Sequence, residues 1–289
     1  MPELPEVETT IKDLQNEVLS RTFVDAWTDF KKNIKKPFEE FREEIKGKKI
    51  EKIWRRGKNI IFELSGGYSL LIHQKLSGHL LHGEWFLKNG KWVPKTNDAL
   101  KERMNDFIHL VLFLDDGKMI ALSDLRKFAK VELWKTESLK ASQEFQKLGP
   151  EPLEKSFTFE KLKEVLKGKK GKIKQVLMNQ EIIAGIGNIY ADEILWKAKI
   201  NPLKCALALE DKELKRIYQA IQEILIRAIK AGGTSVSDYR KISGERGKFE
   251  NFLEAYRREG KKCSRCGEKI ERVRINNRSA HFCPKCQKL

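Results

Sequence analysis

The strongest constraint on the fold is a set of four cysteines near the end of the chain. Cys263-x2-Cys266 is followed after sixteen residues by Cys283-x2-Cys286, and these are four of the five cysteines in 289 residues. Two CxxC pairs at this spacing are typical of a tetrahedral zinc site, in which four thiolates leave no position for a reacting water. The spacing therefore predicts one structural Zn2+ per chain, held in a small ribbon that does no chemistry of its own.

The chain carries a large excess of positive charge. It has 58 Lys plus Arg against 41 Asp plus Glu, which gives a formal net charge of +17. Such an excess favours contact with a polyanion, with nucleic acid as the first candidate and an anionic membrane surface as the second. The longest apolar run, residues 107–114, is too short to span a bilayer, and the first residues do not resemble a signal peptide. We therefore expect a soluble cytoplasmic protein that has no membrane partner.

The spacing of apolar residues changes along the chain and predicts an α+β protein with several domains. Residues 1–135 combine an N-terminal amphipathic helix with strand-like runs around glycine turns, which predicts a mainly antiparallel β-sandwich with flanking helices. Residues 136–156 contain the prolines of LGPEPL and are predicted to be a linker. Residues 157–256 show helical spacing and include one long helix from about Asp211 to Lys230. The cysteine-bearing hairpin occupies residues 257–289.

The first residues, MPELPEVE, place Pro2 directly after the initiator methionine. Removal of Met1 would leave a secondary amine, and an α-amino group has a pKa of about 8, so a useful fraction is neutral at pH 7. A neutral amine can attack an aldehyde-like carbon and form an iminium ion, with Glu3 beside it as a proton donor or acceptor. Most prolines at this position have no such role, so composition alone leaves the terminus as an ordinary helix start.

Seven short motifs are spread over nearly the whole chain. They are PELPEVE at 2–8, RRGK at 55–58, DLRKF at 124–128, LGPEPL at 148–153, IAGIGNIYADE at 183–193, GGTSVSDY at 232–239 and RSAHFCPKCQ at 278–287. In this order they resemble the formamidopyrimidine-DNA glycosylase family, bacterial repair enzymes that excise oxidised purines such as 8-oxoguanine. The resemblance implies a helix–two-turn–helix DNA-binding domain within residues 157–256 and a mobile loop, about 235–250, that covers the lesion.

The resemblance also implies four catalytic residues. Pro2 would attack the sugar C1′ of a nucleotide extruded from the duplex, displace the base and form a Schiff base, while Glu3 would protonate the ring oxygen. Lys58 would contact the phosphate and assist β-elimination. Arg278 would bind the phosphate at the lesion through its planar guanidinium and assist the second elimination.

Further residues match family positions that contact DNA in the N-terminal region. Leu76, Arg126 and Phe128 match a wedge that fills the space left by the extruded base. Leu76 stands where a methionine is common, so it keeps an apolar body but loses the adaptable thioether. Asn105 stands where many relatives carry a histidine that touches DNA, and its shorter amide would still hydrogen-bond a phosphate.

In the helical region, Lys170 and Lys174 match positions that hold phosphates. Asn188 would present its amide at a helix start whose backbone N–H groups favour an anion. Glu6 and Glu193 resemble glutamates that support the nucleophile without touching the substrate.

These expectations together predict a bifunctional glycosylase and AP lyase of base-excision repair. It would act as a monomer on double-stranded DNA that contains an oxidised base or an abasic site, and would cut by β,δ-elimination. Two alternatives remain open from the sequence: an endonuclease VIII-like enzyme for oxidised pyrimidines, and a non-catalytic zinc-ribbon protein that binds nucleic acid. Charge and cysteines fit the second alternative equally well, because affinity needs only phosphate contacts.

Overall fold

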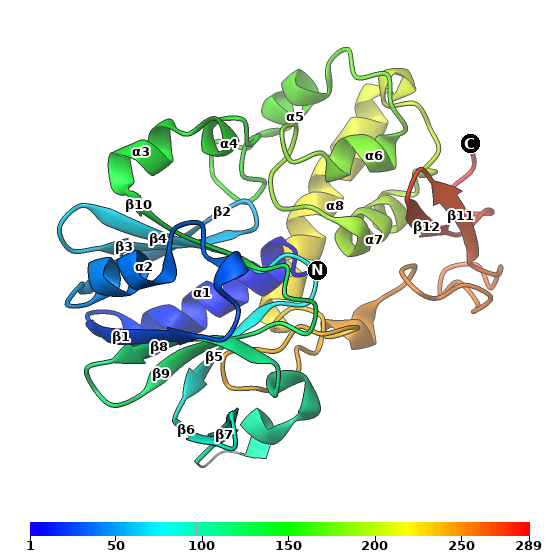
Figure 1. Cartoon of the computed structure of the whole chain (residues 1–289). Helices are drawn as coiled ribbons and strands as arrows, with labels where there is room; N and C mark the ends of the chain where they lie inside the picture. The colour runs from blue at the N-terminus through cyan, green and yellow to red at the C-terminus, as the bar shows by residue number, and fades with distance from the viewer. Residues whose placement is uncertain (96–97) are drawn as a thin grey trace. The chain divides into compact units, whose positions relative to one another are not determined.

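The computed structural model describes residues 1–95 and 98–289, which form two compact units (Figure 1). The N-terminal unit comprises residues 1–146 and 231–250, and the C-terminal unit comprises residues 147–230 and 251–289. Residues 136–146, within the predicted linker, belong to the N-terminal unit. The segment 231–250, which follows the long helix in sequence, belongs to the N-terminal unit rather than to the helical region.

Two antiparallel four-stranded sheets form the framework of the N-terminal unit. The first has the order β1 (Phe23–Thr28), β8 (Ile108–Leu114), β9 (Met119–Ser123), β5 (His79–Gly83). The second has the order β10 (Lys130–Lys135), β4 (Tyr68–His73), β3 (Asn59–Leu64), β2 (Ile50–Arg56). The remaining elements are α1 (Leu4–Val18), α2 (Phe38–Ile45), the hairpin β6 (Trp85–Lys88)–β7 (Lys91–Pro94), α3 (Thr136–Ala141) and α4 (Gln143–Gln146).

Helix α1 packs against both sheets and closes the main core. Its apolar residues at helical spacing, Val7, Ile11, Leu14 and Val18, are all buried in a single cluster with inward-facing residues of both sheets. The predicted hairpin turns are present as well, since β3–β4 turns at residues 66–67 and β8–β9 turns at residues 116–117. The predicted fold class of this region is confirmed.

A second, smaller apolar cluster lies beside the β6–β7 hairpin, which the sequence pattern did not predict. Trp85 and Leu100 are among its buried members, and the ring of Trp92 meets that of Trp27 edge-on at 5.3 Å between centroids. Two short 3-10 turns, Asp98–Lys101 and Arg103–Asn105, follow the hairpin and return the chain to β8. This cluster fixes the position of the two turns.

The C-terminal unit is a helical bundle with a cysteine-bearing hairpin. Its elements are α5 (Phe159–Leu166), α6 (Ile173–Met178), α7 (Asn188–Ala198), α8 (Asp211–Lys230), β11 (Glu271–Ile275) and β12 (Arg278–Phe282). Helix α7 contacts both α8 and β12, so the hairpin packs on the bundle (Figure 1). Helix α8 has the bounds that the apolar spacing predicted. Among the helices of the described residues, none combines the length and the apolar character that a membrane span requires.

Candidate active site

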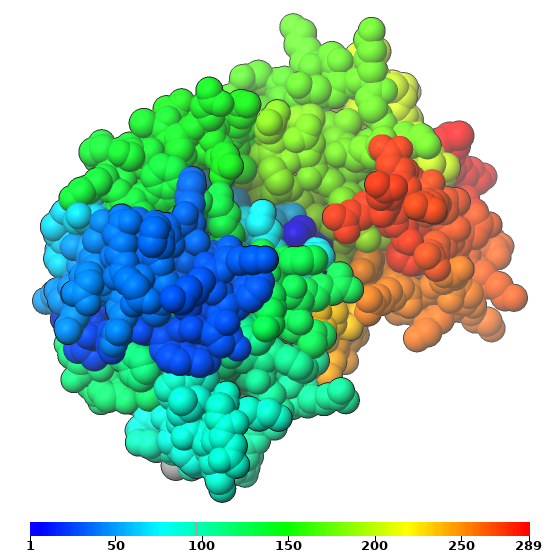
Figure 2. Space-filling model, viewed as in Figure 1, coloured from blue at the N-terminus to red at the C-terminus, as the bar shows by residue number. Residues whose placement is uncertain are grey.

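The N-terminal end of α1 encloses the predicted nucleophile. Pro2 and Glu3 are buried, and the backbone N–H of Glu3 donates to Oε2 of Glu6 at 2.8 Å. The end of the chain itself reaches the surface as a small dark-blue area (Figure 2). Burial lowers the pKa of the α-amino group of Met1 below its usual value. An amine in this environment is therefore shifted toward its neutral, nucleophilic form.

Glu6 also connects α1 to the segment 231–250. Its Oε1 accepts the backbone N–H of Thr234 at 2.8 Å, and its carbonyl oxygen accepts the hydroxyl of Tyr239 at 3.2 Å. Gly233 permits this approach, because its φ is +75° and an added Cβ would lie 2.9 Å from Oε1 of Glu6. The glutamate predicted to support the nucleophile thus holds both the start of α1 and the start of the predicted lesion loop.

The segment 235–250 is packed against the N-terminal unit over most of its length. Ser235, Tyr239 and Ile242 are buried. The hydroxyl of Ser235 donates to the carbonyl of Tyr239 at 2.7 Å and accepts the N–H of Gly247 at 2.9 Å. These internal bonds give the segment, predicted to be mobile from its polar composition, a compact form in which Ser237 is exposed.

Lys58 lies in the tight turn between β2 and β3. Gly57, with φ +58°, makes the turn, and the Lys58 side chain is largely buried. Arg55 ties this turn to α1, because its Nε donates to Oε2 of Glu8 at 2.9 Å and its Nη1 donates to the carbonyl of Gly57 at 3.0 Å. The backbone before Lys58 is therefore fixed relative to the helix that carries Pro2 and Glu3.

His73, at the end of β4, was not among the predicted site residues. Burial lowers its pKa to about 3, and the nearby positive charges of Lys75 and Lys58 act in the same direction. Nδ1 accepts the backbone N–H of Lys75 at 2.9 Å, which assigns the proton of the neutral ring to Nε2. A neutral N–H donor thus stands near Lys58. The only sequence signal was its place directly before QKLSG.

The three predicted wedge residues lie on two loops that are bonded together. Asp124, fully buried, accepts the hydroxyl of Ser77, the neighbour of Leu76. The Ser77 Oγ in turn accepts the backbone N–H of Arg126 at 3.0 Å. Arg126 is exposed, and Phe128 is 58% exposed although it is aromatic. The buried carboxylate therefore shapes a loop that presents an apolar ring and a guanidinium to solvent.

Asn105 lies inside the N-terminal unit, a position that the expected phosphate contact did not suggest. It is 2% exposed, and its Oδ1 pairs with Nε2 of His79 at 2.9 Å. Its Nδ2 donates to the carbonyls of Ala99 at 2.8 Å and Gly244 at 3.2 Å. Because both ends of the amide are bonded within the N-terminal unit, Asn105 joins two loops there.

Lys174 in the C-terminal unit is also buried rather than presented to solvent, against the expectation of a phosphate contact. Its side chain is 1% exposed, and Nζ lies 2.6 Å from Oδ1 of Asp192 and 2.5 Å from the carbonyl of Ser279. Oδ2 of Asp192 accepts the backbone N–H of His281 at 3.0 Å and pairs with its ring Nδ1 at 2.9 Å. This buried network joins α6, α7 and β12.

Arg278 is the first residue of β12 and directly precedes Ser279, whose carbonyl accepts the Lys174 ammonium. It is exposed, and the preceding turn is tight, with Asn276 at φ +50°. Arg278 lines a cavity of about 260 Å³ together with Gln175 and Asn179. Lys170, predicted to hold a phosphate, is exposed in the loop before α6.

The turn before α7 is held by Gln180. Its Nε2 donates to the carbonyl of Ile186 at 2.8 Å, and its Oε1 accepts the N–H of Gly185 at 2.9 Å. Asn188 then begins α7, and within the described residues its Oδ1 is buried and makes no hydrogen bond. This turn therefore places the Asn188 amide at the N-terminal end of α7, where the helix dipole favours a negative charge.

Glu193 organises the chain after the lesion loop. It is 1% exposed, and its carboxylate accepts the backbone N–H groups of Glu254 at 2.9 Å, Ala255 at 2.9 Å and Tyr256 at 2.8 Å. Burial raises the pKa of Glu193 to about 7, although the three hydrogen bonds act in the opposite direction. Its observed role is to cap a turn of the C-terminal unit.

The four cysteines come together as predicted. Their sulfur atoms, of Cys263, Cys266, Cys283 and Cys286, all lie within 4.8 Å of one another. Zn–S bonds of about 2.3 Å in a tetrahedron separate the sulfurs by about 3.8 Å, so the cluster fits one zinc ion. Trp196, Ala255 and Ile270 pack against it. No position is left for water, and the ion is structural.

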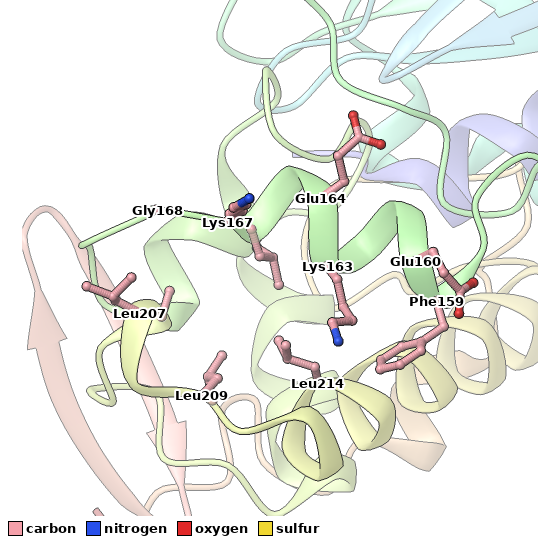
Figure 3. A pocket seen from close by; sticks show the side chains of 11 residues that line it. Phe159, Glu160, Lys163, Glu164, Lys167, Gly168, Leu207, Leu209 and Leu214 are labelled. Atoms are coloured by element: carbon pink, nitrogen blue, oxygen red, sulfur yellow. The ribbon is translucent and has the colours of Figure 1, made fainter.

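One further cavity lies away from these residues. It measures about 640 Å³ and is formed by α5, α8 and the loop that contains Leu207 and Leu209 (Figure 3). Phe159 and Leu214 contribute apolar walls, and lysines and glutamates of α5 stand at its rim (Figure 3). None of the residues predicted to contact DNA is among those that line it.

Comparisons with known proteins agree with this arrangement over the whole chain. Residues 1–131 match the formamidopyrimidine-DNA glycosylase N-terminal domain, residues 148–240 match the formamidopyrimidine-DNA glycosylase H2TH domain, and residues 260–289 match the zinc finger found in FPG and IleRS. The formamidopyrimidine-DNA glycosylase of Pelotomaculum thermopropionicum is 38% identical over 290 residues, which cover 100% of both chains.

Solved structures of similar chains include complexes with damaged DNA. A mutant of the Lactococcus lactis enzyme bound to DNA containing Fapy-dG superposes with a TM-score of 0.87 at 34% identity, covering 100% of both chains. MutM bound to DNA containing carbocyclic 8-oxo-G superposes with a TM-score of 0.86 at 35% identity, again covering 100% of both chains. With its three domains matched in order and its zinc cluster in place, the chain belongs to the formamidopyrimidine-DNA glycosylase family.

Proposed function

We propose that this protein is a bifunctional DNA glycosylase and AP lyase that removes oxidised purines from double-stranded DNA. The observation that carries the proposal is the buried Pro2–Glu3 pair at the start of α1, held by Glu6 and flanked in the same unit by the Lys58 turn. The similarity to enzymes solved with Fapy-dG and 8-oxo-G in their DNA supports a purine lesion as the substrate. The protein would work as a monomer on the DNA of the bacterial cytoplasm.

The chemistry begins at the N-terminus after Met1 has been removed. The secondary amine of Pro2 attacks C1′ of the extruded nucleotide, the glycosidic bond breaks, and the damaged base leaves with a proton. The carboxyl group of Glu3 protonates the sugar ring oxygen, so the ring opens and an iminium ion links Pro2 to C1′. Loss of a C2′ proton then expels the 3′ phosphate, and a second elimination expels the 5′ phosphate.

Positive groups would stabilise the phosphates that leave. Lys58 assists the first elimination, and the guanidinium of Arg278 binds the phosphate and assists the second. Lys174 would act indirectly, because its ammonium holds the carbonyl of Ser279, the residue after Arg278. We assign to it the orientation of Arg278 rather than a phosphate contact.

The remaining predicted DNA-contacting residues would hold and distort the duplex. Phe128, Arg126 and Leu76 enter the space left by the extruded nucleotide, as apolar and arginine wedges do in proteins that kink DNA. Lys170 and Asn188 contact the backbone, and the net charge of +17 adds affinity that is independent of sequence.

Borohydride trapping tests the proposal directly. Purified protein, shown by mass spectrometry to lack Met1, is incubated with a duplex that contains one 8-oxoguanine, and the cross-linked residue is identified. We expect an adduct at Pro2, and a Pro2→Gly variant that binds the same duplex but gives altered trapping. A fully active protein that retains Met1 would refute the N-terminal amine mechanism.

A second experiment with a duplex containing thymine glycol distinguishes a preference for oxidised purines from an endonuclease VIII-like preference for oxidised pyrimidines. Faster trapping on 8-oxoguanine supports the proposed substrate, and faster trapping on thymine glycol contradicts it. Absence of any adduct on oxidised purines, oxidised pyrimidines and abasic sites would leave a DNA-binding protein without this chemistry.

A further inference from the structure

An ion pair between a buried arginine and a partly exposed glutamate joins the lesion loop to the turns that follow the β6–β7 hairpin. The side chain of Arg240 is 2% exposed, and it forms a bidentate salt bridge with Glu102. Its Nε donates to Oε2 and its Nη2 donates to Oε1. The two residues are 138 positions apart in sequence. A buried guanidinium is costly unless it is paired and hydrogen-bonded, so the carboxylate of Glu102 determines where Arg240 can lie.

The same guanidinium also holds the tip of the lesion loop. Its Nη1 donates to the carbonyl of Ser237 at 3.1 Å and to the carbonyl of Tyr239 at 2.7 Å. Five N–H donors in a rigid plane allow one arginine to bind a carboxylate and two carbonyls together. The backbone of residues 237–239 is therefore linked, through Arg240, to the position of Glu102.

A second link holds the far side of the loop. Asn105 donates to the carbonyl of Gly244 at 3.2 Å. Gly244 has φ +87°, and an added Cβ would lie 2.6 Å from the carbonyl oxygen of Ala99. The backbone of Gly244 therefore packs directly against the backbone of Ala99. The carbonyl of Ile242 accepts the N–H of His82 at 2.8 Å. Residues 98–105 thus hold the loop on one side, while Glu6 holds its beginning at Thr234.

We propose that Glu102 and Arg240 are positioning residues that set the tip of the lesion loop, residues 235–239, for recognition of the extruded base. The inference rests on the proposed function, because it assumes that this loop covers the base. Neither residue touches the substrate in this scheme. They act by fixing the backbone of the tip. Their loss should therefore slow excision of the damaged base more than incision of an abasic site, where no base is present.

The test compares two reactions of the same protein. One is excision of 8-oxoguanine from a duplex, and the other is incision of a preformed abasic site in the same sequence, where no base is present for the tip to contact. For Glu102→Gln and for Arg240→Leu we expect kcat/KM of excision to fall about tenfold and that of abasic incision to change less than about twofold. The double variant should be no worse than Arg240→Leu alone, since both changes remove one interaction.

A matched control is available in the same region. Glu84 pairs with Lys95 at 3.1 Å, but both side chains are about half exposed. Glu84→Gln removes an equivalent charge without a buried partner, and we expect it to leave both reactions unchanged. A difference between the Glu84 and Glu102 variants therefore reports on the pair with buried Arg240 and not on net charge.

Amide hydrogen exchange of residues 236–240 provides a readout that does not depend on activity. We expect faster exchange there in Glu102→Gln and Arg240→Leu than in the wild type or in Glu84→Gln. Unchanged exchange, or equal losses in both reactions, would overturn the inference. A wild-type protein that cuts neither substrate would refute the proposed function instead, and the exchange result would still decide whether the pair orders the tip.

Discussion

The carboxylate of Glu6 accepts the backbone N–H of Thr234 at 2.8 Å and, through its other oxygen, the backbone N–H of Glu3 at 2.8 Å. A single buried side chain therefore connects the first turn of α1 to a segment 228 residues later in the chain. Because a buried carboxylate with its hydrogen bonds satisfied is held in one geometry, any change that moves Glu6 moves both the proposed nucleophile and the start of the lesion loop.

Gly233→Ala is expected to displace Glu6. The residue has φ +75°, and its new Cβ would lie 2.9 Å from Oε1 of Glu6 and 3.2 Å from its Cα. Gly117→Ala is the matched control, since Gly117 has φ +81° but nothing within 4 Å of an added Cβ. Strain alone costs about 1–2 kcal/mol, and we expect Gly233→Ala to cost on the order of 1 kcal/mol more.

Denaturant unfolding measures this difference, and excision of 8-oxoguanine measures its effect on the site. We expect excision to fall in Gly233→Ala and to stay at the wild-type rate in Gly117→Ala. Equal losses of stability in the two variants, with unchanged excision in both, would show that the Glu6 contact does not position the catalytic end of α1.

Phe128→Ala should lower activity without lowering stability. The ring is 58% exposed, so its removal should change the free energy of unfolding by less than about 0.5 kcal/mol. Stacking of an aromatic ring on a base is worth about 1–3 kcal/mol, and we expect kcat/KM on the lesion duplex to fall by a corresponding factor. Phe86→Ala, at a 43% exposed aromatic residue of β6, is the control. Equal rates for the two variants would argue against Phe128 as a wedge.

Arg278→Ala is expected to change the products of the reaction. Loss of the guanidinium removes a charged donor to the phosphate, so we expect the δ-elimination product to fall at least about tenfold relative to the β-elimination product. Gel electrophoresis of end-labelled DNA separates the two products. Arg274→Ala is the control, because Arg274 is exposed on β11 of the same hairpin. If Arg274→Ala lowers the ratio of δ- to β-elimination product as much as Arg278→Ala does, the effect results from the charge of the hairpin and not from Arg278 itself.

Removal of zinc should weaken DNA binding. The four thiolates hold the ends of the β11–β12 hairpin, and His281 between them pairs with buried Asp192. Without the metal the hairpin loses its main constraint, so Arg278 and the neighbouring cations are no longer presented together. We expect weaker affinity for a lesion duplex after chelation and recovery when Zn2+ is restored. Unchanged affinity after verified metal loss would contradict a role for the ribbon in binding.

The sequence was most informative for local structure, such as a helix, and for motifs whose residue spacing is set by a metal site. Helix α8 has the predicted bounds because apolar residues at helical spacing and a glycine pair mark its face and its end. The four cysteines could be predicted to meet because CxxC pairs approach a metal from tight turns. Neither prediction needed contacts that are distant in sequence.

The burial of Lys174 and Asn105, both predicted to contact DNA, could not be predicted from the sequence for a common physical reason. A lysine or an asparagine is predicted to lie at the surface unless its hydrogen-bond partner is known. The partners here are distant in sequence: Asp192 and Ser279 for Lys174, and Gly244 for Asn105. The same holds for the segment 231–250, whose place in the N-terminal unit depends on Glu6. Sequence motifs indicated which residues matter, but only tertiary contacts distinguish touching DNA from positioning a neighbour.

Glu193 should make stability fall as pH rises toward neutrality. Its pKa is raised by burial from 4.5 to about 7 in the folded protein, so between these values the native state binds more protons than the unfolded state. The proton-linked stability is therefore fully present below about pH 4.5 and is lost as pH rises through about 7. The lowered pKa of buried His73 acts in the opposite direction over this window, so we measure the contribution of Glu193 as the difference in thermal unfolding midpoint between the wild type and a variant without this carboxyl group.

The thermal unfolding midpoint of Glu193→Gln should rise relative to that of the wild type as pH increases over the same window, whatever its absolute stability, because an amide does not titrate. Its loss of carboxylate hydrogen bonds to residues 254–256 is a constant cost and does not alter the slope. Glu223→Gln, at a half-exposed glutamate of α8, is the control and should keep the wild-type slope. Parallel curves for the wild type and Glu193→Gln would show that this carboxyl group is ionised throughout, with its three backbone N–H groups outweighing the cost of burial.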